Sequence, residues 1–273
     1  MKQTIFITGA STGLGKATAL LFAHKGWQVI ASMRNIQDST EWSNVENIAV
    51  LTLDVTNPEQ IIAVSKEAIA KFGPIDVVFN NAGYGLAGPL EGIEDEQLVR
   101  QLDTNLLGVL RVTKAFVEHF RTNKKGLFIT TTSIGGHLAL PFNSVYHATK
   151  FALEGWSESM WYELKPLGIG IKTVAPGGIL TDFSSRSLDR GNHPAYQENL
   201  SSFINILSSP ERRKNYSTAE QIAEVVYEAA TDGTDQLRYI AGNDAKSFYA
   251  MRKQLSDEEF MASAKKRFFG ENK

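Results

Sequence analysis

The chain has 273 residues, enough to bury a sizeable core, and its composition excludes several classes of function. With 28 Lys and Arg against 30 Asp and Glu, a formal net charge of −2 and no basic block, nothing marks a surface for nucleic acid or an anionic membrane. The absence of Cys excludes disulfides, thiolate nucleophiles and Cys-ligated metals, and the five His residues lack zinc-ligand spacing. A protein that acts on a small molecule is therefore the starting hypothesis.

The N-terminal residues MKQTIFITGA run directly into an apolar strand pattern. That leaves no room for the charged, apolar and cleavage regions of a signal peptide. No apolar run approaches the ~18 residues of a membrane span. We therefore expect a cytoplasmic protein without a membrane span.

Short apolar runs alternate with helical patterns along the chain. Seven runs are continuously apolar, as is typical of strands covered on both faces, at 4–9, 28–33, 47–54, 75–83, 126–133, 170–177 and 237–242. Helical patterns lie between them at 13–25, 58–72, 96–123, 144–165 and 217–231. This βαβ alternation predicts an α/β fold of the Rossmann type, a doubly wound, seven-stranded parallel sheet flanked by helices, in one domain spanning 1–273.

Two segments fall outside the alternation. Residues 182–215 form an irregular stretch that is too long for an ordinary connection and mixes polar residues with apolar ones. Such insertions are more often lids or binding loops than linkers, so we expect a substrate lid there. Residues from about 244 to 273 are rich in charge and are expected to form a C-terminal helical tail.

A glycine-rich turn follows the first predicted strand. Gly9, Gly13 and Gly15 stand in a GxxxGxG spacing where the predicted helix 13–25 begins. Glycines let the backbone approach a phosphate, and the helix N-terminus offers free N–H groups and the positive end of the helix dipole. The alternative is an ordinary Gly-rich turn, whereas a Walker loop is excluded because the G-x-x-x-x-G-K-[ST] spacing is absent.

Tyr146 and Lys150 are four residues apart on the predicted helix 144–165, so their side chains share one face. A free tyrosine titrates near ~10, and a neighbouring ammonium favours the phenolate and lowers that pKa. Proton transfer by Tyr146 then becomes accessible. The Y-x-x-x-K spacing alone also arises by chance between surface residues, so its meaning depends on the other motifs.

Taken together in chain order, the motifs show that the sequence resembles the short-chain dehydrogenase/reductase family. The resemblance covers residues 4 to about 182 and is weaker beyond them. The residues that carry it are Thr8-Gly9-x-x-x-Gly13-x-Gly15, Asn80-Asn81-Ala82-Gly83, Asn105, Ser133, Tyr146-x-x-x-Lys150, Pro176-Gly177 and Thr181.

The resemblance implies four catalytic residues. Tyr146 would be the acid or base at the substrate oxygen, and Ser133 would hydrogen-bond the same oxygen. Lys150 would lower the pKa of the phenol and bind the nicotinamide ribose, while Asn105 would hold a water in a proton relay. Ser133 is not expected to be a hydrolase nucleophile, because no G-x-S-x-G elbow surrounds it.

The resemblance also implies a set of cofactor-binding residues. Asp54 would lie beside the adenine, with a turn or cap before Pro58 as the alternative. Thr181 would hold the carboxamide, with capping of a following helix as the alternative. Asn80 is expected to brace its strand. The predicted set is Gly9, Ser11, Thr12, Gly13, Leu14, Gly15, Arg34, Asp54, Val55, Asn81, Ala82, Gly83, Tyr146, Lys150, Pro176, Gly177, Ile179 and Thr181.

The end of the second predicted strand indicates the choice of cofactor. Met33 stands where NAD-preferring relatives carry Asp, and Arg34 follows it. A guanidinium can bind a 2′-phosphate through paired, charge-assisted hydrogen bonds, whereas an acidic residue would repel it. Many NADP-preferring relatives carry a second basic residue where this chain has Thr12. We nevertheless expect NADP(H), with no metal.

The expected substrate is an alcohol or carbonyl compound. It is bulky and apolar if half of a set of nearby apolar residues faces the cleft, although such residues more often belong to the core. His137 and His147 are expected to be structural or at the rim. The apolar set is Leu138, Leu140, Phe142, Phe183, Tyr196, Phe203 and Ile204.

Two further expectations concern assembly and activity. Small residues opposite Tyr146 on the predicted helix and the apolar pattern of LLGVLRVTKAFVEHF predict paired helices in a homodimer or homotetramer, with packing inside one chain as the alternative. The leading functional hypothesis is hydride transfer between NADP(H) and the substrate. The competing one is a catalytically silent dinucleotide-binding sensor or scaffold.

Overall fold

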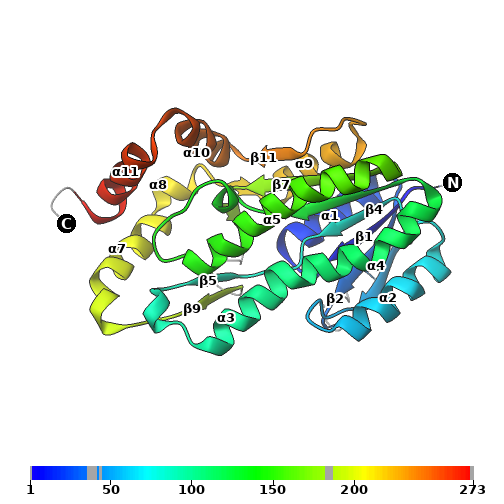
Figure 1. The fold of residues 1–273 in the computed structure, drawn as a ribbon, viewed down its shortest axis with the longest axis horizontal. Helices are drawn as coiled ribbons and strands as arrows, with labels where there is room; N and C mark the ends of the chain where they lie inside the picture. The colour runs from blue at the N-terminus through cyan, green and yellow to red at the C-terminus, as the bar shows by residue number, and fades with distance from the viewer. Residues whose placement is uncertain (1, 36–41, 43–44, 182–186, 271–273) are drawn as a thin grey trace.

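A seven-stranded, wholly parallel sheet forms the centre of the molecule (Figure 1). The computed structural model describes residues 2–35, 42, 45–181 and 187–270. The strand order is β11-β7-β6-β4-β1-β2-β3. The bounds are β1 Thr4–Thr8, β2 Gln28–Met33, β3 Ile48–Thr52, β4 Val77–Asn80, β6 Gly126–Thr131, β7 Ile169–Pro176 and β11 Arg238–Ala241. The prediction of a seven-stranded parallel α/β fold is confirmed, and each strand lies within a predicted run or one residue outside it.

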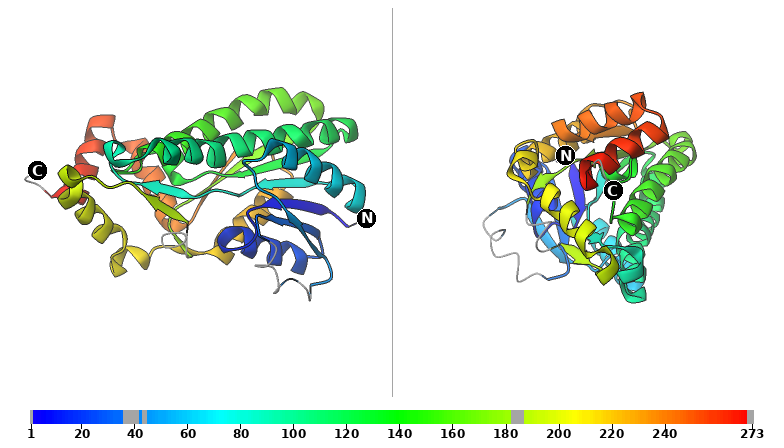
Figure 2. Two further views of the ribbon diagram at one scale, coloured as in Figure 1. Left: turned by 90° about the horizontal axis from the view of Figure 1, so that it is seen from below. Right: turned by 90° about the vertical axis from the view of Figure 1, so that its left-hand side faces the viewer.

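Helices cover both faces of the sheet because successive strand residues point to opposite sides. In β1, Ile5 and Ile7 pack toward α1 (Gly13–His24) and α9 (Ala219–Thr231), whereas Phe6 packs toward the other face. That other face is covered by α2 (Pro58–Phe72), α4 (Gly108–Asn123) and α5 (Ser144–Leu164). Figure 2 shows the resulting layers from two further directions. This double cover is why the strands read as continuous apolar runs.

The strand order reverses between β1 and β4. From β1 the chain proceeds outward through β2 and β3, then returns to the other side of β1 and proceeds through β4, β6 and β7. Open parallel sheets bind ligands in the crevice beyond the carboxyl ends of the strands at such a switch point. The residues that follow β1, β4, β6 and β7 are therefore the candidates for a site.

A π-helical turn interrupts the segment predicted as one helix at 96–123. The helix α3 spans Asp95–Leu102, the π turn spans Asp103–Leu107, and α4 follows without a break in the chain direction. Asn105 lies inside the π turn and is buried. Single π turns are frequent at functional sites, because they re-aim the side chains of a helix.

The expectation of an irregular stretch at 182–215 was wrong for its described part. Residues 187–215 include β9 (Leu188–Arg190), α7 (Gln197–Leu207) and α8 (Pro210–Arg213). The strand β9 pairs in parallel with β5 (Gly85–Ala87), and β10 (Ser217–Thr218) pairs with β8 (Ile179–Leu180). These short elements are fixed by pairing with distant segments, so local periodicity did not reveal them.

Two helices follow the last strand, α10 (Asn243–Gln254) and α11 (Asp257–Phe269). Ser256 separates them, because its side chain caps α11 by accepting a hydrogen bond from the Glu259 amide. The helix α11 packs against α7, where Ser202 Oγ donates to the Phe268 carbonyl at 3.0 Å. In Figure 1 these helices gather at one end of the molecule, beyond the sheet.

Candidate active site

The glycine-rich turn after β1 is packed too closely for side chains. Gly9 has a φ of +67°, and a Cβ there would lie 2.7 Å from the Ala82 Cα. A Cβ on Gly15 would collide with the Gly9 carbonyl oxygen. Gly13 differs, since it has a φ of +54° and, among the described residues, Thr181 is the neighbour whose atoms lie within 4 Å of its Cβ position. The turn therefore leaves open backbone at Gly13, where the sequence predicted a phosphate.

The first turn of α1 leaves N–H groups available for an anion. Thr12 is the N-cap residue but makes no side-chain capping hydrogen bond, and the first turn contains no acidic residue. Ser11 is half-buried, Thr12 is exposed, and Leu14 is buried in the core beneath the turn. A helix N-terminus of this kind attracts negative charge.

Thr8 and Asn81 join the turn after β1 to the turn after β4. Thr8 Oγ1 accepts hydrogen bonds from the amides of Asn81 and Ala82, both at 3.0 Å. In return, Asn81 Nδ2 donates to the carbonyls of Thr8 and Gly9 at 3.2 and 3.1 Å. The predicted cofactor residues of these two turns are thus one connected unit.

Asn80 and Gly83 flank this unit. Asn80 Nδ2 donates to Thr113 Oγ1 at 3.0 Å, so the residue braces β4 against α4 as the sequence analysis expected. Gly83 lies against Asn105, whose Oδ1 would be 3.2 Å from a Cβ on the glycine.

The turn after β7 lies beside the glycine-rich turn after β1. Thr181 lies next to Gly13, because its Cγ2 is 3.7 Å from the Cβ position of that glycine. Pro176 ends β7, Gly177 follows it, and Ile179 begins β8. Asp244 of α10 accepts a hydrogen bond from the Gly178 amide at 2.8 Å and leaves no space for a side chain at Gly177. Sequence reasoning missed Asp244, because it lies 66 residues from its partner.

Ser133, Tyr146 and Lys150 meet at the carboxyl end of β6. Ser133 follows that strand and accepts a hydrogen bond from the Gly135 amide at 3.0 Å, while its side chain also hydrogen-bonds the Tyr146 phenol. Lys150 Nζ lies 5.7 Å from the centre of the Tyr146 ring and donates to the Thr131 carbonyl at 2.8 Å. Lys150 is buried, with 6% of its surface exposed. The buried Lys150 amine and the half-buried Ser133 and Tyr146 therefore share a single corner.

Burial shifts the pKa values of two groups at this corner. Burial raises the pKa of Tyr146 above that of a free phenol, and the Ser133 hydrogen bond offsets only part of this effect. Burial also lowers the pKa of Lys150 to about 8, although the nearby Glu154 carboxylate favours the ammonium. Desolvation therefore dominates the pKa of Tyr146 in this structure, and the lowering of that pKa by Lys150 stays a prediction.

Asn105 uses both ends of its amide on one neighbouring residue. Its Oδ1 accepts from the Tyr84 amide at 3.0 Å, and its Nδ2 donates to the Tyr84 carbonyl at 2.8 Å. The side chain thus holds the chain just after the Asn81–Gly83 turn.

Arg34 and Asp54 stand at the ends of neighbouring strands, away from the catalytic corner. Arg34 is exposed directly after the buried Met33, which ends β2. Asp54 Oδ1 accepts from the amide and the hydroxyl of Thr56, at 2.9 and 2.8 Å, and so has the turn role that the sequence left open. Val55 is buried against Gly108 at the start of α4.

Both histidines near the corner are structural. His147 Nε2 accepts from the Leu140 amide at 3.0 Å, and its Nδ1 lies 2.8 Å from the Gly135 carbonyl, which requires the Nδ1–H tautomer. Burial lowers the pKa of His147, so the ring is held neutral. His137 packs edge-on against Tyr249. His147 thus fastens the segment before α5 to the helix that carries Tyr146.

Aromatic rings gather beside the catalytic helix. Phe142, at an unusual φ of +57°, contacts the rings of Tyr196, Phe203 and Phe269 at centroid distances of 6.5, 5.7 and 6.1 Å. Phe203 and Leu138 are buried, while Leu140 and Ile204 are half-buried. Phe183 lies outside the described residues. Sequence reasoning missed Phe269, whose signal was an apolar pair in an otherwise charged tail.

No group of three His, Asp or Glu side chains within the described residues has the geometry to hold a metal ion. Nor is any helix in that part of the chain long and apolar enough to cross a membrane.

Comparison with known proteins gives the family. The sequence profile described as short chain dehydrogenase matches residues 3–191. The chain belongs to the short-chain dehydrogenase/reductase family. The resemblance recognised in the sequence is thereby confirmed, and the protein is an oxidoreductase of this family.

Two relatives indicate how far the similarity extends. An uncharacterized oxidoreductase of Schizosaccharomyces pombe is 36% identical over 234 residues, covering 86% of this chain and 98% of the relative. A 3-ketodihydrosphingosine reductase of Bacteroides thetaiotaomicron is 34% identical over 213 residues, covering 77% of each chain.

Two solved structures share the fold. A short-chain dehydrogenase from Streptomyces avermitilis is 28% identical, with a TM-score of 0.84, and the match covers 93% of this chain and 92% of that one. An alcohol dehydrogenase from Thermococcus sibiricus, in complex with 5-hydroxy-NADP, is 25% identical, with a TM-score of 0.73, and the match covers 89% and 97%.

Proposed function

We propose that this protein transfers hydride between NADP(H) and an apolar alcohol or carbonyl compound, with Tyr146 as the general acid or base. The observation that carries the proposal is the convergence of Ser133, Tyr146 and Lys150 in one corner beyond β6. A bound nicotinamide supplies the hydride, and the protein must then handle one proton and the charge that develops on the substrate oxygen.

The side chains divide this work. Tyr146 exchanges the proton with the substrate oxygen, and Ser133 holds the same oxygen by a hydrogen bond. Lys150 binds the cofactor ribose and supplies positive charge near the phenol, whose raised pKa keeps it protonated and ready to donate in the direction of carbonyl reduction. Asn105 acts by holding the backbone at Tyr84, and its π turn is the proposed site of the water relay.

The residues at the switch point fit a dinucleotide. The open backbone at Gly13 and the uncapped first turn of α1 suit a pyrophosphate, and a side chain at Gly9 or Gly15 would collide with the neighbouring backbone and distort the turn. Thr181 lies against the same glycine and is proposed to bind the carboxamide. Asp54 and Val55, which follow β3, would lie beside the adenine.

NADP(H) rather than NAD(H) is proposed because of Arg34. The residue is exposed at the carboxyl end of β2, and Met33 fills the position where an acidic residue would repel a 2′-phosphate. A guanidinium at this position is free of the buried core and suits paired hydrogen bonds to a phosphate. The complex of the Thermococcus sibiricus enzyme with an NADP derivative supports this choice.

An apolar substrate is proposed because of the aromatic rings next to α5. Phe142 precedes Tyr146 by four residues, and its ring meets rings from α7 and α11. The described part of the predicted lid, residues 187–215, contributes α7 to this wall, so its movement would open or cover the corner. A related protein is named 3-ketodihydrosphingosine reductase, and a keto substrate of that kind agrees with the proposed reaction.

The proposed acid–base role is tested by Tyr146→Phe. A panel of ketones and aldehydes is first screened with NADPH to find a substrate. The variant should then lose nearly all turnover but keep its NADPH affinity, because only the transferable proton is removed. Tyr162→Phe is the matched control, since Tyr162 lies on the same helix and is exposed.

Retention of more than about a tenth of the unmodified rate by Tyr146→Phe would refute the assignment. A protein that binds NADPH but reduces no member of the panel would favour the alternative, a dinucleotide-binding sensor or scaffold without turnover.

A further inference from the structure

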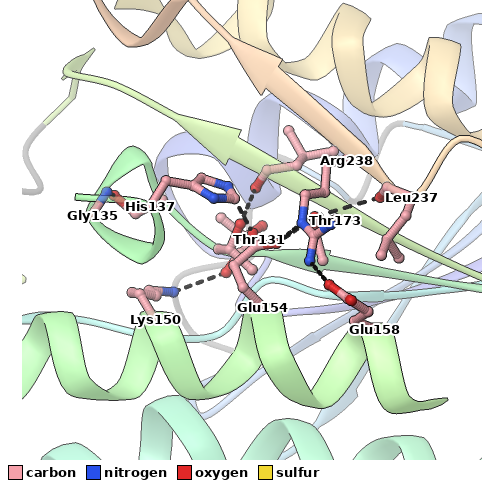
Figure 3. A network of polar contacts seen from close by, with 12 residues as sticks. Thr131, Gly135, His137, Lys150, Glu154, Glu158, Thr173, Leu237 and Arg238 are labelled. Atoms are coloured by element: carbon pink, nitrogen blue, oxygen red, sulfur yellow. Dashed lines mark hydrogen bonds and ion pairs between the residues drawn. The ribbon is translucent and has the colours of Figure 1, made fainter. Parts of the chain in front are cut away.

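A buried carboxylate lies one helical turn beyond Lys150. Glu154 is 4% exposed and follows Lys150 by four residues on α5, so both side chains lie on the same face of the helix. Figure 3 shows Glu154 between Lys150 on one side and Arg238 on the other. A buried, charged carboxylate destabilises the fold unless it is paired. The contacts of Glu154 therefore decide what it does beside the catalytic corner.

Three elements hold this carboxylate. Arg238, at the start of β11, donates from Nε to Glu154 Oε2 at 3.0 Å, and Thr173 of β7 donates to the same oxygen at 3.3 Å. His137 Nε2 lies 3.4 Å from Oε1, within ion-pair range but without hydrogen-bond geometry. Arg238 also pairs with Glu158, which is half exposed at the next turn of α5. The carboxylate is thus fixed in one place by partners that belong to the sheet.

Close packing of Gly136 against α5 also fixes the backbone at Lys150. Gly136 packs against α5 so closely that a Cβ there would lie 2.9 Å from the Lys150 carbonyl oxygen and 3.0 Å from Glu154 Cγ. Lys150 Nζ meets one carbonyl, that of Thr131. Within the described residues, the charged groups around Glu154 are therefore Lys150, Glu158, His137 and Arg238, with Tyr249 packed behind His137.

Glu154 is ionised at neutral pH. Burial by itself would raise the pKa of its carboxyl, but His137, Thr132 and Arg238 together hold that pKa below its usual value. Its negative charge favours the ammonium form of Lys150, against the burial that disfavours it. With the pKa of Lys150 at about 8, a fall of ~0.5 unit would leave about half of the amine neutral near pH ~7.4, and a fall of about one unit would leave most of it neutral.

We propose that Glu154 is a positioning residue for the active site, where its carboxylate, anchored by Arg238 and Thr173, keeps the buried Lys150 in its charged form. The catalytic importance of this effect rests on the proposed function, because only a charged Lys150 binds the cofactor ribose and stabilises a developing phenolate. The effect on the charge of Lys150 does not depend on turnover.

The experiment follows Lys150 directly in the full-length protein. Lysine is labelled with ¹³C at Cε, the Lys150 resonance is assigned by its loss in Lys150→Met, and its titration is recorded by NMR. In Glu154→Gln the midpoint should fall by at least ~0.5 pH unit, the scale expected for one charge at this separation in a partly screened interior. Glu158→Gln is the matched control, which should shift the midpoint by less than half as much because that carboxylate is exposed.

Glu154→Asp keeps the negative charge, so its Lys150 titration midpoint should lie closer to that of the unmodified protein than to that of Glu154→Gln. A shift below ~0.2 pH unit in Glu154→Gln, or an equal shift in Glu158→Gln, would overturn the proposal. If Glu154→Gln does not fold, Thr173→Val replaces it: it removes one anchor of the carboxylate without changing any charge, so the midpoint should fall, and an unchanged midpoint would contradict the proposal.

The pH profile of kcat/KM separates this inference from the proposed function. If the protein turns over a carbonyl substrate, the profile of Glu154→Gln should show the same downward displacement as the NMR midpoint. A downward NMR shift without turnover in any variant would uphold the electrostatic role of Glu154 and reject the proposed oxidoreductase mechanism.

Discussion

The Thr8 hydroxyl is expected to hold two turns of the cofactor site together, and Thr8→Val removes it with little change of shape. The substitution leaves the amides of Asn81 and Ala82 without their 3.0 Å acceptor. An unsatisfied buried donor costs about 1–3 kcal/mol, and water can reach these half-buried residues in part. We therefore expect the free energy of unfolding to fall by about 2–4 kcal/mol.

Thr8→Ser is the matched control for this prediction. It keeps the hydroxyl and removes one buried methyl group, which costs about 1 kcal/mol. Urea unfolding gives both free energies, and NADPH titration gives the affinity, which should weaken in Thr8→Val because Asn81 also holds the Gly9 carbonyl. If Thr8→Val unfolds within ~0.5 kcal/mol of Thr8→Ser, the two amides find other acceptors and the reasoning fails.

Three other predictions concern the cofactor, acid stability and assembly. Arg34→Ala should weaken NADPH binding by roughly 2–3 kcal/mol and leave NADH binding nearly unchanged, whereas similar kcat/KM values for the two cofactors in the unmodified protein would contradict a selective role. Burial raises the Asp232 pKa, but hydrogen bonds from Lys172, Tyr239 and Thr234 together lower it further, to about 2. Its stabilisation is therefore present above pH ~4 and is lost as pH falls toward 2. Asp232→Asn should cost about 1–2 kcal/mol at pH 7 and less below pH ~4 in urea unfolding, and an equal cost at both pH values would disprove the linkage. Phe151 and Tyr162 are 45% and 67% exposed on α5, where the predicted pairing of helices between subunits would cover them. Light scattering at micromolar concentration should therefore show a dimer or tetramer, and monomer alone would reject the pairing.

Local patterns in the sequence were enough to predict much of the candidate active site. The Tyr146–Lys150 spacing places both groups on one face of α5, and Gly9 and Gly15 after β1 stand where a side chain would collide. Both features depend on neighbours within a few residues, so they can be read without knowing the fold. The strand positions were predictable for the same reason, since continuous apolar runs reflect burial on both faces.

Elements fixed by distant partners escaped prediction. The segment 187–215 was expected to be irregular, yet β9 is formed by pairing with β5 about a hundred residues earlier. The helix α7, by contrast, carries a helical apolar spacing at Leu200, Phe203, Ile204 and Leu207, which the expectation of an irregular stretch overlooked. Phe269 was overlooked because the rings it meets come from other parts of the chain.

The charge states of the site belong to the tertiary structure alone. The sequence by itself determined the seven strands, the glycine turn and the shared face of Tyr146 and Lys150, all of which follow from local stereochemistry and periodicity. It could not determine that burial would dominate the pKa values of both residues, nor that Arg238, 84 residues away, would anchor Glu154. Desolvation and ion pairing depend on which segments the fold brings together, and that was decided by the packing of the helices on the sheet.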